Sequence, residues 1–258
     1  MTGADGVRVG LLTAGSGPPL LLVHGGMGSM ESWGGAWDAL AGGRRVTAMD
    51  RRGRGSSGDA AGYSLDREFA DVAAVAALLA DAHGGPVDAA GHSLGATCLL
   101  GAAALGAPLR RLVLYEPPGP PTVAGGWPDR LDAMLAAGQR GPAVFSFLTE
   151  IIGLTPEQVA ALRDAPGSQD ALSVAAATLP REARALAAAD LAAAARQVSQ
   201  PVRLLLGESS PPWARRITGE LTAVLPAATV AALPGTGHEG LQAAPGLVAA
   251  EIARFLDC

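Results

Sequence analysis

The chain has 258 residues, of which 49% are hydrophobic and 17% are charged, a composition typical of a globular protein and not of a disordered chain. The net charge of −5, without a basic stripe interleaved with aromatic residues, argues against nucleic-acid binding. No apolar run reaches the roughly 18 to 20 residues that span a bilayer, so no membrane partner is expected. The N-terminus lacks the basic region and apolar core of a secretory signal, which predicts a cytoplasmic protein.

Neither a metal nor another cofactor is expected. The two cysteines, Cys98 and Cys258, make neither a disulfide framework nor a metal site, and no ligand cluster has the spacing of a metal centre. All 19 basic residues are arginines. Arg51, Arg52 and Arg54 gather in a glycine-rich turn, and we interpret this basic cluster as structural.

Short apolar runs bounded by glycine and proline alternate with longer helical patterns, which predicts βα units and a mostly parallel sheet. The predicted strands cover residues 7–14, 20–23, 45–49, 87–90, 109–115, 202–206 and 229–233. The predicted helices cover residues 30–41, 66–82, 94–105, 212–224 and 246–255. Helices 66–82 and 246–255 carry the clearest pattern, because their apolar residues recur at three- and four-residue spacing.

This alternation stops between residues 117 and 200, where prolines are followed by alanine-rich helical patterns without a strand. We therefore expect a core domain formed by residues 1–116 and 201–258, with residues 117–200 inserted as a helical cap. Apolar side chains of the cap and of one core loop are candidates to bind an apolar substrate, and ordinary packing between helices is the alternative for each. These candidates are Met27, Trp127, Phe145, Phe147 and Leu148.

The strongest motif is the G-x-S-x-G pattern at residues 91–95 (GHSLG), which follows a predicted strand and opens a predicted helix. In this setting Ser93 stands on a strained turn as a candidate nucleophile. Gly91 and Gly95 flank it because a Cβ at either position would collide with the neighbouring strand and helix. The alternative is a glycine-rich turn with an idle serine.

A second glycine-rich segment, residues 24–28 (HGGMG), directly follows the strand 20–23. Acyl transfer needs hydrogen-bond donors aimed at the oxygen that becomes negative in the tetrahedral intermediate. We expect the N–H of Gly26, or that of Met27, to form an oxyanion hole with the N–H of Leu94. His24 is expected to brace this loop and not to act as a base.

His238 lies in the glycine-bounded segment 234–240 (PGTGHEG) and is the candidate general base. A base must reach the nucleophile and also move enough to protonate the leaving group, which suits such a loop. The other three histidines have other expected places. His83 ends a helix, His92 adjoins the nucleophile, and His24 braces the loop described above.

The segments HGG, DRRGRG, GHSLG, VLYEPP, LLLGESSPPW and PGTGHEG occur in this order along the chain. Together they make the chain resemble the α/β-hydrolase superfamily over essentially its whole length. Residues 50–55 match the turn after the third core strand of that family. The resemblance implies an α/β fold with a mostly parallel eight-stranded sheet flanked by helices and a cap inserted after strand six.

The triad acid is missing from its usual place. Most family members have an aspartate after the next-to-last strand, in a pattern like G-x-x-D-P, but residues 207–211 read GESSP and place Ser210 there. Certain haloalkane dehalogenases and the fungal zearalenone lactonases carry the acid one core strand earlier, which in this chain corresponds to Glu116. Glu208 is the alternative acid. A solvated carboxylate at the start of the cap is the alternative role for Glu116.

These residues predict hydrolysis of a carboxylic ester or lactone of a small, largely apolar molecule through an acyl-enzyme on Ser93, with His238 as base and then acid. A thioesterase or a C–C bond hydrolase with the same triad is an alternative. Another is a non-catalytic ligand-binding protein, for which Ser210 is the support. A haloalkane dehalogenase or an epoxide hydrolase is disfavoured, because those enzymes need an aspartate in place of Ser93.

Overall fold

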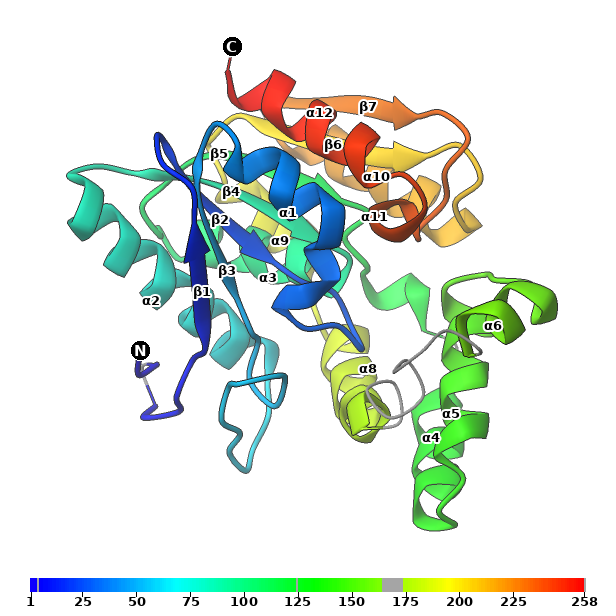
Figure 1. Cartoon of the computed structure of the whole chain (residues 1–258). Helices are drawn as coiled ribbons and strands as arrows, with labels where there is room; N and C mark the ends of the chain where they lie inside the picture. The colour runs from blue at the N-terminus through cyan, green and yellow to red at the C-terminus, as the bar shows by residue number, and fades with distance from the viewer. Residues whose placement is uncertain (4, 124, 164–173, 258) are drawn as a thin grey trace.

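The computed structural model of the chain describes residues 1–3, 5–123, 125–163 and 174–257 (Figure 1). In this part of the chain a seven-stranded sheet has the order β1-β3-β2-β4-β5-β6-β7. The strands are β1 (Leu11–Ala14), β2 (Pro19–Val23), β3 (Arg45–Met49), β4 (Val87–His92), β5 (Leu109–Tyr115), β6 (Val202–Gly207) and β7 (Ala228–Leu233). β1 pairs antiparallel with β3, and all other neighbouring strands are parallel.

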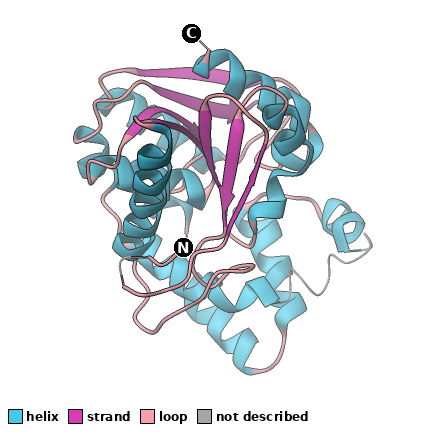
Figure 2. Ribbon diagram, turned by 60° about the vertical axis from the view of Figure 1, so that its left-hand side comes forward, coloured by secondary structure: helices cyan, strands magenta, loops and turns pink. Residues whose placement is uncertain are grey.

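Helices cover both faces of the sheet (Figure 2). The helices of the sheet region are η1 (Met30–Trp33), α1 (Gly34–Ala41), α2 (Leu65–His83), α3 (Leu94–Ala104), α10 (Pro212–Val224), α11 (Gly240–Ala243) and α12 (Pro245–Leu256). The alternation of side chains along a strand divides the core in two. In β2, Leu21 and Val23 pack with α2 and α3, whereas Leu20 and Leu22 pack with α1 and α12. Burial on both faces explains why the parallel strands read as continuous apolar runs.

Between β5 and β6 the described residues form helices, as the sequence predicted. These inserted helices are η2 (Pro120–Thr122), α4 (Trp127–Ala136), α5 (Arg140–Ser146), η3 (Phe147–Ile151), α6 (Pro156–Arg163), η4 (Ala176–Thr178), α8 (Leu179–Ala187) and α9 (Leu191–Arg196). Several of them share an apolar cluster of their own, which includes Trp127, Leu131 and Leu179. In Figure 1, α4, α5 and α6 lie apart from the sheet.

The predicted sheet of eight strands is wrong by one strand in the described part of the chain. The N-terminal residues form a tight turn, in which the N–H of Gly3 donates to Val7 O, and a single bridge joins Thr2 and Arg8. A turn of this length leaves too few extended residues for a further strand, so β1 begins at Leu11 and not at residue 7. The predicted helix 30–41 is broken at Gly34, whose φ of 40° is outside the helical range.

The fold brings the carboxyl ends of the parallel strands to one edge of the sheet. The segments that follow β2, β4, β5, β6 and β7 contain Gly26, Ser93, Glu116, Ser210 and His238. In open α/β sheets this edge is where ligands bind. No described helix is both long enough and apolar enough to cross a membrane.

Candidate active site

Ser93 stands on the sharp turn between β4 and α3. Its φ of 53° is strained for a residue with a side chain, and its N–H donates to Tyr115 O at 2.8 Å. A Cβ on Gly91 would lie 2.7 Å from the backbone N of Ala96, and one on Gly95 would overlap the carbonyl oxygen of Val23. The two glycines therefore permit the close approach of strand and helix that places Ser93 at the sheet edge.

Glu116 and His238 are in direct contact although 122 residues separate them in the sequence. The Nδ1 of His238 lies 2.7 Å from Glu116 Oε2, and both side chains are buried. The other carboxylate oxygen, Oε1, accepts hydrogen bonds from the N–H of Gly207 at 2.7 Å and from the hydroxyl of Ser210. This arrangement holds the proton of His238 on Nδ1 and leaves Nε2 as the nitrogen that can accept one.

Glu208 is in a different environment. It is exposed, and its Oε2 accepts a hydrogen bond from the N–H of Gly235 at 3.0 Å. Of the two carboxylates considered from the sequence, the structure brings Glu116, and not Glu208, to His238.

Three aromatic side chains fix the loop that carries His238. The Nε2 of His92 donates to His238 O at 2.9 Å, and the hydroxyl of Tyr115 donates to Gly237 O. The ring centroid of Trp213 lies 5.1 Å from that of His238 in an edge-on contact. Burial, and after it the neighbouring His238, lower the pKa of His92 to about 3, so His92 is neutral at physiological pH.

The ring centroid of His238 lies 4.7 Å from that of His92, the residue before Ser93. In the described part of the chain no hydrogen bond joins the Ser93 hydroxyl to His238. Bonds of this kind are often long in enzymes without substrate and shorten when substrate binds.

The loop after β2 packs directly against Ser93, since a Cβ on Gly25 would lie 2.9 Å from the Cβ of Ser93. The carbonyl of Gly25 accepts a hydrogen bond from His24 Nδ1 at 2.8 Å, and the N–H of Arg51 donates to His24 Nε2 at 3.0 Å. Burial lowers the pKa of His24 well below its usual value, which keeps the ring neutral with its proton on Nδ1. His24 therefore braces the loop, as expected from the sequence. Because the Gly25 carbonyl and the Gly26 N–H belong to one peptide group, fixing the carbonyl also fixes the direction of that N–H.

Backbone strain is concentrated at this edge of the sheet. Among the described residues other than glycine, positive φ angles occur at Met27 (56°), Ser93 (53°) and Glu116 (46°). Such conformations cost about 1 to 3 kcal/mol each and persist where the surrounding structure enforces them. The three residues follow β2, β4 and β5, and they lie in or beside the candidate oxyanion loop, nucleophile and acid.

A cavity opens beside Ser93, between the sheet edge and the inserted helices. It is lined mainly by apolar groups, and its lining includes the candidate oxyanion residues Gly26 and Leu94. Of the predicted substrate-binding residues, Trp127 and Phe147 line it. The rest of the lining is formed by Pro118, Thr122, Val123, Ile151, Leu179, Glu182, Ala183, Leu186 and Trp213.

Three predicted substrate-binding residues are placed elsewhere. Phe145 is 45% exposed, because two helical residues turn the chain by about 200° and Phe147 takes the inward direction. Leu148 is buried in the apolar cluster of the inserted helices, and Met27 packs against that cluster. None of these three is among the described residues that line the cavity.

Glu182 and Trp213 are among the lining residues that the sequence analysis did not identify as candidates. Glu182 lies on the apolar stripe of α8 formed by Leu179, Ala183 and Leu186, and a lone carboxylate on such a stripe is the signal that could have identified it. Trp213 is part of the segment after β6, but its contact with His238 depends on the tertiary fold.

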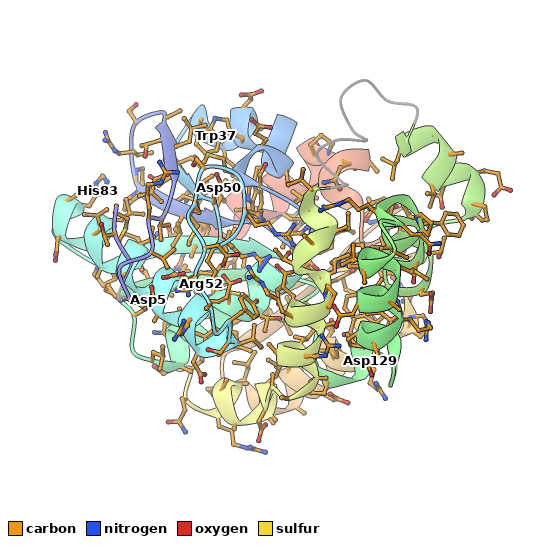
Figure 3. The ribbon with its side chains drawn as sticks, turned by 90° about the horizontal axis from the view of Figure 1, so that it is seen from below. Asp5, Trp37, Asp50, Arg52, His83 and Asp129 are labelled. Atoms are coloured by element: carbon orange, nitrogen blue, oxygen red, sulfur yellow. The ribbon has the colours of Figure 1, made fainter. Side chains whose placement is uncertain are left out.

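Buried ion pairs connect Glu182 to the arginine cluster after β3. Arg51 donates to Glu182 Oε1 at 3.1 Å and to Glu68 at 2.9 Å, and Arg54 donates to Glu182 Oε1 at 2.9 Å. The third arginine, Arg52, donates to Asp71 and Asp5 instead, and Figure 3 labels Arg52 and Asp5. The cluster is structural as predicted, and two of its members also join the sheet region to α8.

Comparison with known proteins identifies the family of the chain. Residues 20–251 match the model of an alpha/beta hydrolase family. An alpha/beta hydrolase from Sphaerobacter thermophilus is 35% identical, with 99% of each chain covered and a TM-score of 0.86. A hydrolase from Pseudomonas aeruginosa is 22% identical, with coverage of 100% of this chain and 97% of that one and a TM-score of 0.81.

An enol-lactonase from Burkholderia xenovorans is 20% identical, with 98% of each chain covered and a TM-score of 0.75, a likeness that shows the fold alone. A search of the curated proteins gave no match. The family match extends over most of the chain. The protein belongs to the alpha/beta hydrolase family.

Proposed function

We propose that the protein is a serine hydrolase that cleaves a carboxylic ester or lactone of a small, largely apolar molecule. The observation that carries this proposal is the 2.7 Å contact between His238 Nδ1 and Glu116 Oε2 at the sheet edge where Ser93 occupies a strained turn. A carboxylate in this position keeps the imidazole in the tautomer that accepts a proton at Nε2, and it stabilises the imidazolium that then forms.

The reaction follows from the roles of these side chains. Ser93 Oγ attacks the carbonyl carbon while His238 Nε2 takes its proton, and the N–H groups of Gly26 and Leu94 stabilise the oxyanion. The tetrahedral intermediate collapses, the alcohol leaves with the proton from His238, and the acyl group stays on Ser93. A water molecule then attacks the acyl-enzyme while His238 takes its proton. The second tetrahedral intermediate collapses and releases the acid, and Ser93 Oγ recovers the proton from His238.

The nature of the cavity supports an apolar substrate. Aromatic and aliphatic side chains, among them Trp127, Phe147 and Leu186, form most of the lining next to Ser93. Small-molecule sites of this kind obtain affinity from apolar contact and orientation from a few polar groups. The enol-lactonase shares the fold, which makes lactones a reasonable first class to test alongside simple esters.

The test is covalent labelling followed by a substrate screen. Intact mass spectrometry after incubation with a serine-directed fluorophosphonate should find one adduct on the wild type and none on Ser93→Ala. A panel of aryl esters, lactones and thioesters should then give turnover that Ser93→Ala lowers by about 10³- to 10⁶-fold. Absence of an adduct and of any turnover by the wild type would overturn the proposal.

A non-catalytic ligand-binding protein is a weaker reading of the same residues. It depended on Ser210 at the usual acid position, but Glu116 contacts His238 and accepts a hydrogen bond from Ser210. Thioesterase and C–C bond hydrolase activities would use the same triad, and the substrate panel separates them from ester hydrolysis.

A further inference from the structure

Glu182 is an unusual component of the cavity. Among the described residues that line the cavity, it is the one carboxylate or cationic side chain, and its neighbours on α8 in the lining are Leu179, Ala183 and Leu186. The Glu182 side chain is nearly fully buried, and the described lining contains no cationic side chain that could pair with it. A charge in such a place acts strongly on a bound molecule, because the apolar wall screens it less than water does.

Glu182 Oε2 lies next to Gly26, a residue of the candidate oxyanion hole that also lines the cavity. A Cβ built on Gly26 would lie 3.8 Å from Glu182 Oε2 and 3.7 Å from Phe147 Cζ, so the α-carbon of Gly26 faces both of these lining residues. Oε2 accepts one hydrogen bond, from Arg54 at 3.1 Å. Oε1 accepts from Arg54, Arg51 and Thr178.

The positive charges that pair with Glu182 belong to Arg51 and Arg54. Arg51 and Arg54 are buried and are not among the described residues of the cavity lining. Arg51 is shared with a second carboxylate, Glu68, so two arginines and two glutamates balance in this cluster. Burial raises the pKa of Glu182, but Arg54 and Arg51 outweigh burial and hold the pKa below its usual value, which keeps the carboxylate ionised at neutral pH.

We propose that Glu182 determines substrate charge, so that the enzyme accepts esters with an uncharged acyl group and rejects esters whose acyl group carries a carboxylate. The proposal rests on the proposed function, because it assigns specificity to that same site. A second anion in the cavity would be repelled by Glu182, and it would lose its hydration without gaining a cationic partner from the described lining. A neutral acyl group is not repelled by Glu182 and has no charge to desolvate, and it gains apolar contact with the lining.

The test compares two acyl groups of matched length, in p-nitrophenyl pentanoate and mono-p-nitrophenyl glutarate. The ratio of kcat/KM for the neutral ester to that for the anionic ester should exceed about 10² in the wild type. In Glu182→Gln, which keeps the size of the side chain, this ratio should fall at least about tenfold, mainly through a lower KM for the anionic ester.

Glu68→Gln is the matched control. It removes one negative charge from the same buried cluster and breaks the same kind of contact with Arg51, but Glu68 is not part of the described cavity lining. In Glu68→Gln the ratio of kcat/KM for the neutral ester to that for the anionic ester should stay within about threefold of the wild-type ratio. An unchanged ratio in Glu182→Gln, or an equal shift in Glu68→Gln, would overturn the proposal. Thermal unfolding followed by circular dichroism confirms that both variants fold.

Binding separates this proposal from the proposed function. In the Ser93→Ala background, quenching of tryptophan fluorescence measures the affinity for the same two esters without turnover. Charge selection is supported if the Ser93→Ala variant binds the neutral ester more tightly and the added Glu182→Gln substitution abolishes this preference. That result would support it even where the wild type hydrolyses neither ester and hydrolase function is refuted. Equal affinity for the two esters in the Ser93→Ala variant refutes charge selection, even where the wild type is an active esterase.

Discussion

The hydroxyl of Ser210 donates a hydrogen bond to Oε1 of Glu116, the carboxylate whose other oxygen contacts His238. Ser210 occupies the position where most relatives of this fold class are expected to carry the triad acid. A serine there cannot offset the charge of an imidazolium, but it supports a carboxylate that comes from the neighbouring strand β5. The two positions thus contribute to one acid group, with the charge on Glu116 and a donor on Ser210.

Replacing the candidate acid should nearly abolish turnover. In Glu116→Gln we expect kcat to fall by about 10³- to 10⁴-fold, because an amide neither stabilises the imidazolium nor enforces the productive tautomer. Glu208→Gln, which alters an exposed side chain, should change kcat less than threefold. Steady-state kinetics on the best ester of the panel measures both. A larger loss in Glu208→Gln would move the acid to that residue.

Removing the Ser210 hydroxyl should weaken the acid without abolishing it. In Ser210→Ala, Glu116 keeps its contact with His238 and its hydrogen bond from the Gly207 N–H. One lost hydrogen bond to a buried charge corresponds to about 1.5 to 3 kcal/mol, which predicts a loss of kcat of roughly 10- to 150-fold with little change in KM. A variant as active as the wild type would show that the hydroxyl does not support catalysis.

The close approach at Gly95 predicts a loss of stability in Gly95→Ala. The added methyl would overlap the carbonyl oxygen of Val23 and separate α3 from β2, at a cost of about 1 to 3 kcal/mol or more. Gly219→Ala in α10 is the control, because no atom lies within 4 Å of the added Cβ and alanine favours a helix by about 1 kcal/mol. Urea unfolding should place the two variants on opposite sides of the wild type.

Burial of neutral histidines predicts that the protein loses stability on mild acidification. The pKa of His92 is about 3 in the folded protein and about 6.5 in an unfolded chain. Between these values the unfolded state binds a proton that the folded state does not, so the contribution of His92 is present above pH 6.5 and declines below it. Between pH 7 and pH 5 this amounts to about 2 kcal/mol, and His24 acts in the same direction.

The contribution of His92 can be isolated with one substitution. Urea unfolding at pH 7 and at pH 5 should give a difference in unfolding free energy that is about 2 kcal/mol smaller for His92→Gln than for the wild type. His83→Gln, which changes an exposed residue at the end of α2, should leave the difference unaltered. Identical differences for wild type and His92→Gln would contradict the assigned burial effect.

The sequence alone could predict the residues at the strand ends, because local rules determine them. Glycines on each side of Ser93, an apolar run before it and a helix after it describe one turn. Parallel strands then bring the residues that follow them to one edge of the sheet. The family resemblance put Glu116 ahead of Glu208 as the candidate acid, and the 2.7 Å contact between Glu116 and His238 agrees with that choice.

The remaining features depend on contacts that a local pattern does not contain. The lining role of Phe147 and the exposure of Phe145 depend on how a short helical segment is rotated relative to the cavity. Glu182 pairs with Arg51 and Arg54, which are 131 and 128 residues away along the chain, so the sequence near Glu182 does not indicate its partners. The eighth strand was expected from family resemblance, whereas the turn at Gly3 determines what the N-terminal residues form.

The N–H of Glu116 donates to Leu205 O at 3.2 Å, and the N–H of Ser93 donates to Tyr115 O at 2.8 Å. The candidate acid and nucleophile are therefore anchored in the sheet by their own backbones, although Glu116 directly precedes the inserted helices. A transplanted or redesigned insertion between β5 and β6 would change which molecules enter while leaving these two anchors in place. Substrate range and chemical machinery are thus separable targets for protein engineering. Glu182 belongs to the insertion, so a graft has to supply another partner for Arg51 and Arg54, which stay with the sheet region.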